Sequence, residues 1–113
     1  MKRKLFLIII CIIIANIAFS GDNRVNKELL LGNWLDEMNT IYVFKSNDRG
    51  FTRHFQFKIQ FIYKYEKGTI NIKFEENGGE PEEYLIIKFT GKIMIVINKK
   101  NNQQKKFTRI GYQ

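Results

Sequence analysis

The segment from Phe51 to Tyr65 alternates between apolar and polar side chains over almost its whole length. Successive residues of a strand point to opposite faces of a sheet, so this spacing predicts a ribbon with one apolar face and one polar face. A helix would scatter the same residues around its circumference. The apolar set is Phe51, Phe55, Phe57, Ile59, Phe61, Tyr63 and Tyr65. The fold class predicted from this pattern is antiparallel all-β.

The pattern does not show whether this segment forms one strand or two. It contains no Gly, Pro or Asn, and only Arg53 and Ile62 break the alternation. Because turns usually contain such residues, two arrangements are compatible with the pattern. The segment is either one bent strand or two strands joined without the usual turn residues.

The first twenty residues have the composition of a secretory signal peptide. Basic residues at positions 2–4 precede an apolar run at 5–14, and Ala18-Phe19-Ser20 offers small residues where a signal peptidase cuts. We therefore expect residues 1–20 to be removed and residues 21–113 to form a single exported domain, periplasmic or extracellular. The alternative is an uncleaved N-terminal anchor, although the apolar run is shorter than the roughly 20 residues that span a bilayer.

Charge and cysteine content limit what the exported part can be. Nineteen Lys and Arg stand against 11 Asp and Glu, and three of the cations lie in the predicted signal, which leaves a modest positive excess. The lone cysteine, Cys11, also lies in the signal, so no disulfide is expected in the domain. Charges gather at 75–83 and 99–106, where they do not alternate with aromatic residues. Solvated loops explain these runs better than a nucleic-acid platform does.

Further short runs predict a succession of hairpins. A short helix is expected over 25–31, with Asn23 as its N-cap and Gly32 as its stop. Uninterrupted hairpin order favours an up-and-down meander that closes into a small barrel and so removes the exposed edges, with a sandwich as the alternative. Besides 51–65, strands are expected at 41–44, 69–74, 84–89, 92–98 and 106–110.

Two short motifs at the ends of this meander resemble the lipocalin superfamily, in particular its small bacterial lipocalin-like domains. Gly32-Asn33-Trp34 precedes the first strand, and Phe107-Thr108-Arg109 lies on the last. The resemblance implies a barrel in which Trp34 lies across the closed end, Arg109 packs over its indole, and Gly32 lets the backbone pass close. Ligand-carrying members usually have longer strands, so the alternative is a barrel filled by its own side chains.

The sequence shows no constellation typical of catalysis. His54, the only histidine, lies on the polar side of the long run, no His/Cys cluster has metal-ligand spacing, and no Gly-rich phosphate loop is present. The chain is therefore not expected to be an enzyme or to carry a metal or a cofactor.

The residues and the resemblance together indicate two candidate functions. The first is an exported binding module that takes a small apolar molecule against Phe55, Phe57, Phe61 and Tyr63; the alternative is that these rings only form the core. The second is an envelope protein-interaction or inhibitor module, presented by strands 84–89 and 92–98, which are apolar on both sides. An oligonucleotide-binding barrel would fit the positive net charge of the chain but not its predicted export, so no nucleic-acid partner is expected. Contact with a membrane is expected only through the signal segment.

Overall fold

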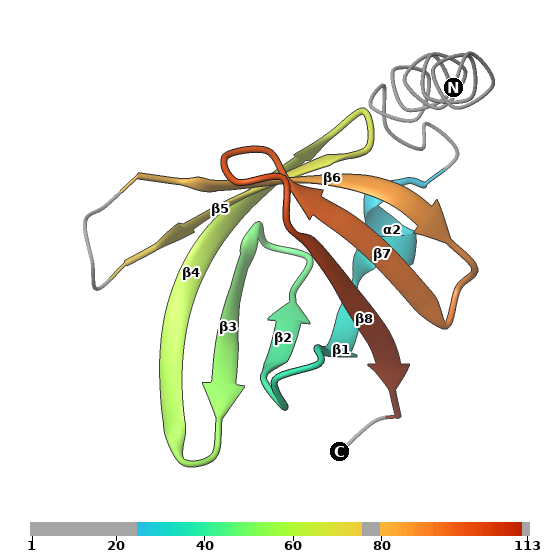
Figure 1. Cartoon of the computed structure of the whole chain (residues 1–113). Helices are drawn as coiled ribbons and strands as arrows, with labels where there is room; N and C mark the ends of the chain where they lie inside the picture. The colour runs from blue at the N-terminus through green and yellow to red at the C-terminus, as the bar shows by residue number, and fades with distance from the viewer. Residues whose placement is uncertain (1–24, 76–79, 112–113) are drawn as a thin grey trace, which may run out of the picture.

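A computed structural model describes residues 25–75 and 80–111. Within them, eight strands form a closed antiparallel barrel in which each strand pairs with the next along the chain, preceded by one short helix (Figure 1). The prediction of an all-β meander that closes into a barrel is confirmed. The predicted signal peptide at 1–20 lies outside the described residues.

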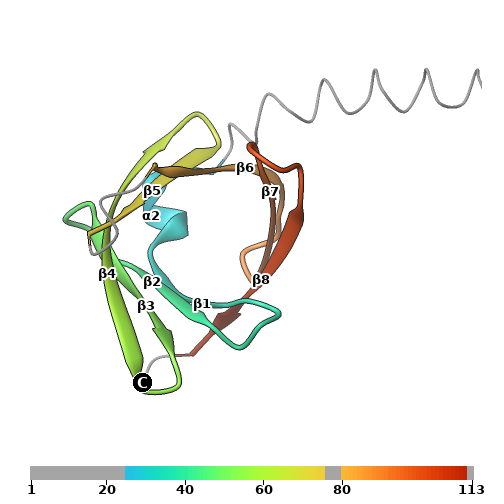
Figure 2. The ribbon, with the colours of Figure 1, turned by 60° about the vertical axis from the view of Figure 1, so that its left-hand side comes forward.

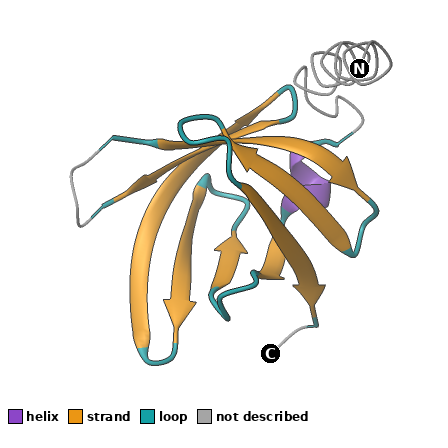
Figure 3. Cartoon of the chain, viewed as in Figure 1, coloured by secondary structure: helices purple, strands orange, loops and turns teal. Residues whose placement is uncertain are grey.

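Strands make up most of the described chain, and the loops between them are short (Figure 3). The bounds are α2 Lys27–Leu30, β1 Gly32–Leu35, β2 Ile41–Phe44, β3 Arg49–His54, β4 Phe57–Glu66, β5 Thr69–Phe74, β6 Glu82–Phe89, β7 Ile93–Asn98 and β8 Gln104–Ile110. No helix among the described residues is long and apolar enough to cross a bilayer.

The barrel closes through the pairing of its first and last strands. Trp34 in β1 lies opposite Arg109 in β8, and Leu35 lies opposite Thr108. Seen after a turn of 60° from Figure 1, the strands form a ring with α2 inside its outline (Figure 2). Closure satisfies the backbone groups that an open edge would expose, which explains how a sheet of short strands avoids pairing with other chains.

Helix α2 is shorter than the sequence predicted. It begins at Lys27, and the Asn26 side chain caps it by accepting a hydrogen bond from the Leu29 amide at 3.0 Å. Asn26 therefore caps the helix, and the predicted cap Asn23 lies outside the described residues. Leu30, the last helical residue, is fully buried, so the helix carries an apolar side chain into the core.

The long alternating segment forms two strands, β3 and β4, joined by a two-residue turn at Phe55 and Gln56. His54 lies directly opposite Phe57, and opposed residues share a face of the sheet. The inward face therefore passes from even positions in β3, such as Thr52, to odd positions in β4, such as Phe61. The prediction that all odd positions share one face is wrong, because this turn reverses the parity.

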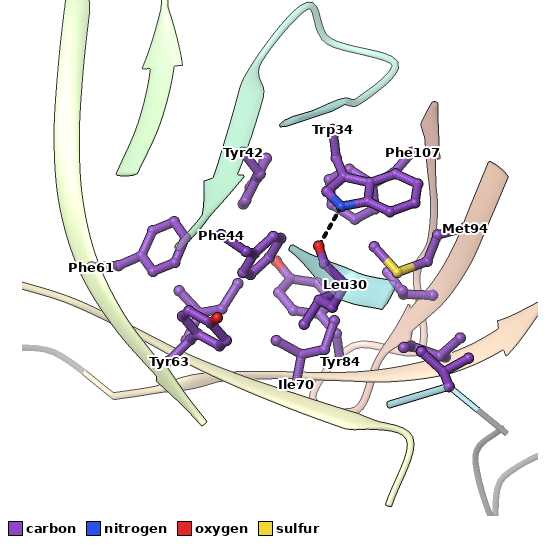
Figure 4. Packing of buried hydrophobic residues seen from close by; sticks show 14 residues of the cluster. Leu30, Trp34, Tyr42, Phe44, Phe61, Tyr63, Ile70, Tyr84, Met94 and Phe107 are labelled. Atoms are coloured by element: carbon purple, nitrogen blue, oxygen red, sulfur yellow. Dashed lines mark hydrogen bonds between the residues drawn. The ribbon is translucent and has the colours of Figure 1, made fainter. Parts of the chain in front are cut away.

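The core fills the barrel with one cluster of buried side chains (Figure 4). The ring of Phe61 is central to it, since its centroid lies 5.5 Å from that of Phe44 and 5.7 Å from that of Phe74. Such tilted and edge-on contacts are the favoured geometries of aromatic pairs. The cluster consists of Val25, Leu30, Trp34, Tyr42, Phe44, Phe61, Tyr63, Ile70, Ile72, Tyr84, Ile86, Met94, Val96 and Phe107.

Candidate functional site

One end of the barrel is closed around Trp34. This side chain is fully buried, and its Nε1 donates a hydrogen bond to the Leu30 carbonyl oxygen at 2.8 Å. The guanidinium carbon of Arg109 lies 4.2 Å from the centroid of the indole. A cation over an indole face is worth about 0.5–2 kcal/mol. The helix, the first strand and the last strand therefore meet at this one side chain.

Arg109 also binds three backbone carbonyls at the closed end. Its Nε donates to the Gly91 oxygen at 2.8 Å, in the turn between β6 and β7. Its Nη1 donates to Leu31 at 2.8 Å and its Nη2 to Leu29 at 2.5 Å, at the end of α2. Hydrogen bonds from an ionised donor are stronger than neutral ones. Arg109 thus joins the helix end to the β6–β7 turn.

Gly32 allows this arrangement by having no side chain. Its φ is +123°, a conformation that L residues with a side chain rarely adopt, and a Cβ built there would lie 2.8 Å from Nη1 of Arg109. Any larger residue would therefore push the guanidinium from its place. The structure brings together Gly32, Trp34 and Arg109, the three residues that the lipocalin resemblance implied at the closed end.

The four residues predicted to bind an apolar ligand do not form one site. Phe61 and Tyr63 are buried in the core, whereas Phe55 and Phe57 are 77% and 67% exposed on the β3–β4 hairpin. The prediction that the four rings lie together on the inner face is wrong. Phe55 lies in the turn itself, and Phe57, although it is on the same side of β4 as Phe61, lies at the tip of the hairpin beyond the packed core.

The other end of the barrel presents polar side chains around Lys105. This residue lies at the start of β8, four positions before Arg109. Its Nζ lies 3.1 Å from the Tyr42 hydroxyl and 3.5 Å from Oδ2 of Asp36, whose side chain is 3% exposed. The ammonium also lies 5.7 Å from the centroid of the Tyr84 ring. We call Asp36, Tyr42, Tyr84 and Lys105 the mouth cluster.

Asp36 also shapes the loop that follows β1. Its Oδ1 accepts hydrogen bonds from the backbone amides of Met38 and Thr40, both at 2.9 Å. One carboxylate oxygen therefore holds the β1–β2 turn while the other faces Lys105. The buried charge is thereby paired and hydrogen-bonded, as burial requires.

A cleft of about 650 Å³ opens beside the mouth cluster. The hydroxyl of Tyr84 donates to Oε1 of Glu82 at 2.6 Å, so Glu82 belongs both to the cleft wall and to the surroundings of the cluster. At the rim, Lys100 and Glu80 form an ion pair of 3.1 Å. The cleft is lined by Phe74, Glu80, Pro81, Glu82, Asn98, Lys100 and Asn101.

The titration of the mouth cluster follows from its burial. Burial raises the pKa of Tyr42 and of Tyr84 above the ordinary value, and the hydrogen bond to Glu82 raises that of Tyr84 further. Burial alone would lower the pKa of Lys105, but Tyr42 and Asp36 more than offset it and leave it raised. At neutral pH both phenols are therefore protonated and the ammonium is charged, so that Lys105 donates to the Tyr42 hydroxyl and Tyr84 donates to Glu82.

We expect the free energy of unfolding to fall as the pH rises from 10 to about 12. Burial, assisted by Asp48, raises the pKa of Tyr63 from 10.0 to about 12. The unfolded chain then loses phenolic protons first, so stability is full below pH 10 and decreases through this window. The raised pKa of Lys105 acts in the same direction. Urea denaturation at several pH values measures the fall, and Tyr63→Phe should make it shallower; a flat profile would contradict this prediction.

The sequence does not predict the mouth cluster, because Lys105 lies in a charged run that is typical of a solvated loop. A signal was nevertheless present, since Lys105, Phe107 and Arg109 alternate along one strand and Phe107 is buried. Strand alternation places all three on the inner face.

His54, the only histidine, lies 3.1 Å from the Thr40 hydroxyl. No group of three or more potential metal ligands occurs in the part of the chain described.

No family model matches the chain, and a search of curated proteins finds none similar to it. The geometry of the barrel and its two ends is therefore the basis for a proposed function.

Proposed function

We propose that this chain is an exported, lipocalin-like binding module that holds a small amphipathic molecule at the open end of its barrel. The observation that carries the proposal is the contrast between the two ends. One end is sealed by Trp34 and Arg109. The other end has inward-facing polar side chains and a cleft of about 650 Å³, a size within the usual range of ligand sites.

The walls of the cleft indicate the chemistry of the ligand. Phe74 and Pro81 supply apolar surface, while Glu82 and Asn98 supply polar groups. Two carboxylates line the cleft against one ammonium, so a neutral or cationic molecule is favoured over an anion. A ligand with an apolar ring or chain and an amino or hydroxyl donor fits this set.

This site differs from the one expected from the sequence. The rings of Phe61 and Tyr63 pack against core neighbours, with Phe44 edge-on to Tyr63 at 5.0 Å. Their contacts stabilise the fold, and the ligand is placed at the mouth instead. The interior still contributes, because it fixes the strands on which Tyr42, Tyr84 and Lys105 stand.

The test is native mass spectrometry of the protein purified from its own host, compared with Asn101→Trp. Asn101 is exposed and lines the cleft, so an indole there should exclude the ligand without disturbing the core. Gln103→Trp is the matched control, since Gln103 is exposed in the same loop and does not line the cleft. We expect a small molecule retained by the natural protein and the control but lost from Asn101→Trp. No retained molecule, or equal retention by all three, would contradict the proposal.

The same spectra test the proposed export. A mass that begins at Gly21 supports cleavage of the signal, whereas an intact N-terminus supports an anchored protein.

A second candidate function is protein binding by the outer face of β6 and β7. Ile97 is partly exposed on this face, opposite the buried Leu85, and the two line an apolar cleft of about 170 Å³ with Lys99 and Asn102. A protein that co-purifies with the natural chain but not with Ile97→Ser, in the absence of any small molecule, would favour this role over ligand binding.

A further inference from the structure

The hairpin of β3 and β4 carries an exposed aromatic tip that the fold does not require. Phe55 is 77% exposed and Phe57 is 67% exposed. The hairpin forms the lower left corner of the molecule in Figure 1, away from α2 and the closed end. Large apolar side chains exposed together at one point are a sign of an interaction site.

The backbone at the tip makes the choice of Phe55 more unusual. Its φ is +56°, in the left-handed region that is costly for a bulky residue and that two-residue hairpin turns usually fill with Asn or Gly. The ring contacts His54 edge-on at 4.5 Å, a neighbour that is itself near the tip. Asn or Gly would suit the turn better. The presence of Phe55 at this position is therefore best explained by an interaction of its ring with a partner outside the barrel.

Basic residues lie directly behind the tip on the outer face. Arg53 and Lys58 are opposite each other across β3 and β4, an arrangement of like charges that destabilises a sheet. Neither forms an ion pair within residues 25–75 and 80–111. The ammonium groups of Lys58 and Lys45 lie 4.3 Å and 5.3 Å from the centroid of Phe51. The hairpin thus has apolar rings at its end and cations along its side.

We propose that this hairpin docks the protein on an anionic phospholipid bilayer, with Phe55 and Phe57 among the acyl chains and Arg53 and Lys58 at the headgroups. Apolar insertion and attraction to anionic lipid act together in peripheral binding, and each basic residue near such a surface adds to it. The order of the groups, rings first and cations behind, matches the depth profile of a bilayer. Single-stranded nucleic acid is a poorer fit, because the Phe51 face that bases would stack on is covered by two lysines. The docking role is additional to the ligand site and does not depend on it.

The test is flotation with vesicles of phosphatidylcholine, with and without phosphatidylglycerol. The protein beginning at Gly21 is used, because it keeps every strand and the whole core but lacks the apolar N-terminal run. We expect binding only to the anionic vesicles. The double variants Phe55→Ser/Phe57→Ser and Arg53→Gln/Lys58→Gln should each weaken it roughly tenfold or more.

Matched controls separate the tip from general surface effects. Ile62→Ser removes an exposed apolar side chain farther along β4, and Lys64→Gln/Lys88→Gln removes two exposed cations elsewhere. Both controls should bind within about twofold of the natural protein, and circular dichroism checks that all variants fold. Binding that is absent, that is equal on neutral vesicles, or that falls equally in the controls would overturn the proposal. So would binding to single-stranded DNA without binding to vesicles.

A second measurement reports insertion directly. The chain has a single tryptophan, the buried Trp34, so Phe57→Trp places a second one at the tip. We expect its emission to shift to the blue and to be quenched by brominated lipid, while Ile62→Trp changes little. A tip tryptophan that stays fully hydrated on the vesicles would contradict insertion.

Discussion

Replacing Arg109 by alanine should lower the free energy of unfolding by about 3–5 kcal/mol, among the larger effects of a single substitution. The change removes a cation over Trp34 and three hydrogen bonds to the carbonyls of Leu29, Leu31 and Gly91. Hydrogen bonds from charged groups contribute about 1.5–3 kcal/mol each, and partial exposure of the site to water reduces the sum. Urea denaturation followed by the fluorescence of Trp34 measures the loss.

Two other variants show whether the effect belongs to this site. Arg109→Lys keeps the charge but cannot donate in three directions, so it should recover only a minor part of the loss. Arg49→Ala removes an exposed arginine paired with Glu75 at 3.1 Å and should cost less than about 1 kcal/mol. If Arg109→Ala costs no more than Arg49→Ala, Arg109 does not hold the closed end together.

Gly50→Ala should cost at least about 3 kcal/mol or prevent folding, because overpacking against rigid atoms is destabilising. A Cβ built on Gly50 would lie 2.1 Å from the backbone oxygen of Val43 and 2.6 Å from the ring of Phe61. Gly50 pairs with Phe44 in β2 and with Phe61 in β4, so neither neighbour can retreat without breaking the sheet. The same denaturation experiment measures the loss.

Gly111→Ala is the control for this substitution. A Cβ on Gly111 would meet no atom within 4 Å. We expect a change of less than about 0.5 kcal/mol, as for most surface substitutions. Equal stabilities of the two variants would show that Gly50 is not packed as described.

The fold could be predicted because its signals are local. Strand alternation and short turns extend through the chain, and only an up-and-down order joins such strands without crossing connections. Gly32, Trp34 and Arg109 were predicted from a resemblance, and the structure brings them within contact. The turn at Phe55 and Gln56 could not be predicted, because it contains none of the residues that usually mark a turn.

The mouth cluster is a product of the tertiary structure. Asp36 and Lys105 lie far apart in the sequence and meet only because β1 and β8 are neighbours in the closed barrel. Their charges are ordinary in a sequence with many cations, so composition gave no reason to select them. The exposed tip could not be predicted for a related reason: Phe55 and Phe57 are exposed because the chain turns at Phe55 and Gln56, beyond the packed core, and the sequence does not mark that turn.

The most direct test of the central claim, that β1 and β8 close the barrel, is nuclear magnetic resonance of the isotope-labelled protein beginning at Gly21. We expect cross-strand contacts between Asn33 and Ile110 and between Leu35 and Thr108, together with shifts of the Arg109 side-chain protons by the Trp34 ring. Contacts of β1 with β2 only and of β8 with β7 only would show an open sheet and contradict the account.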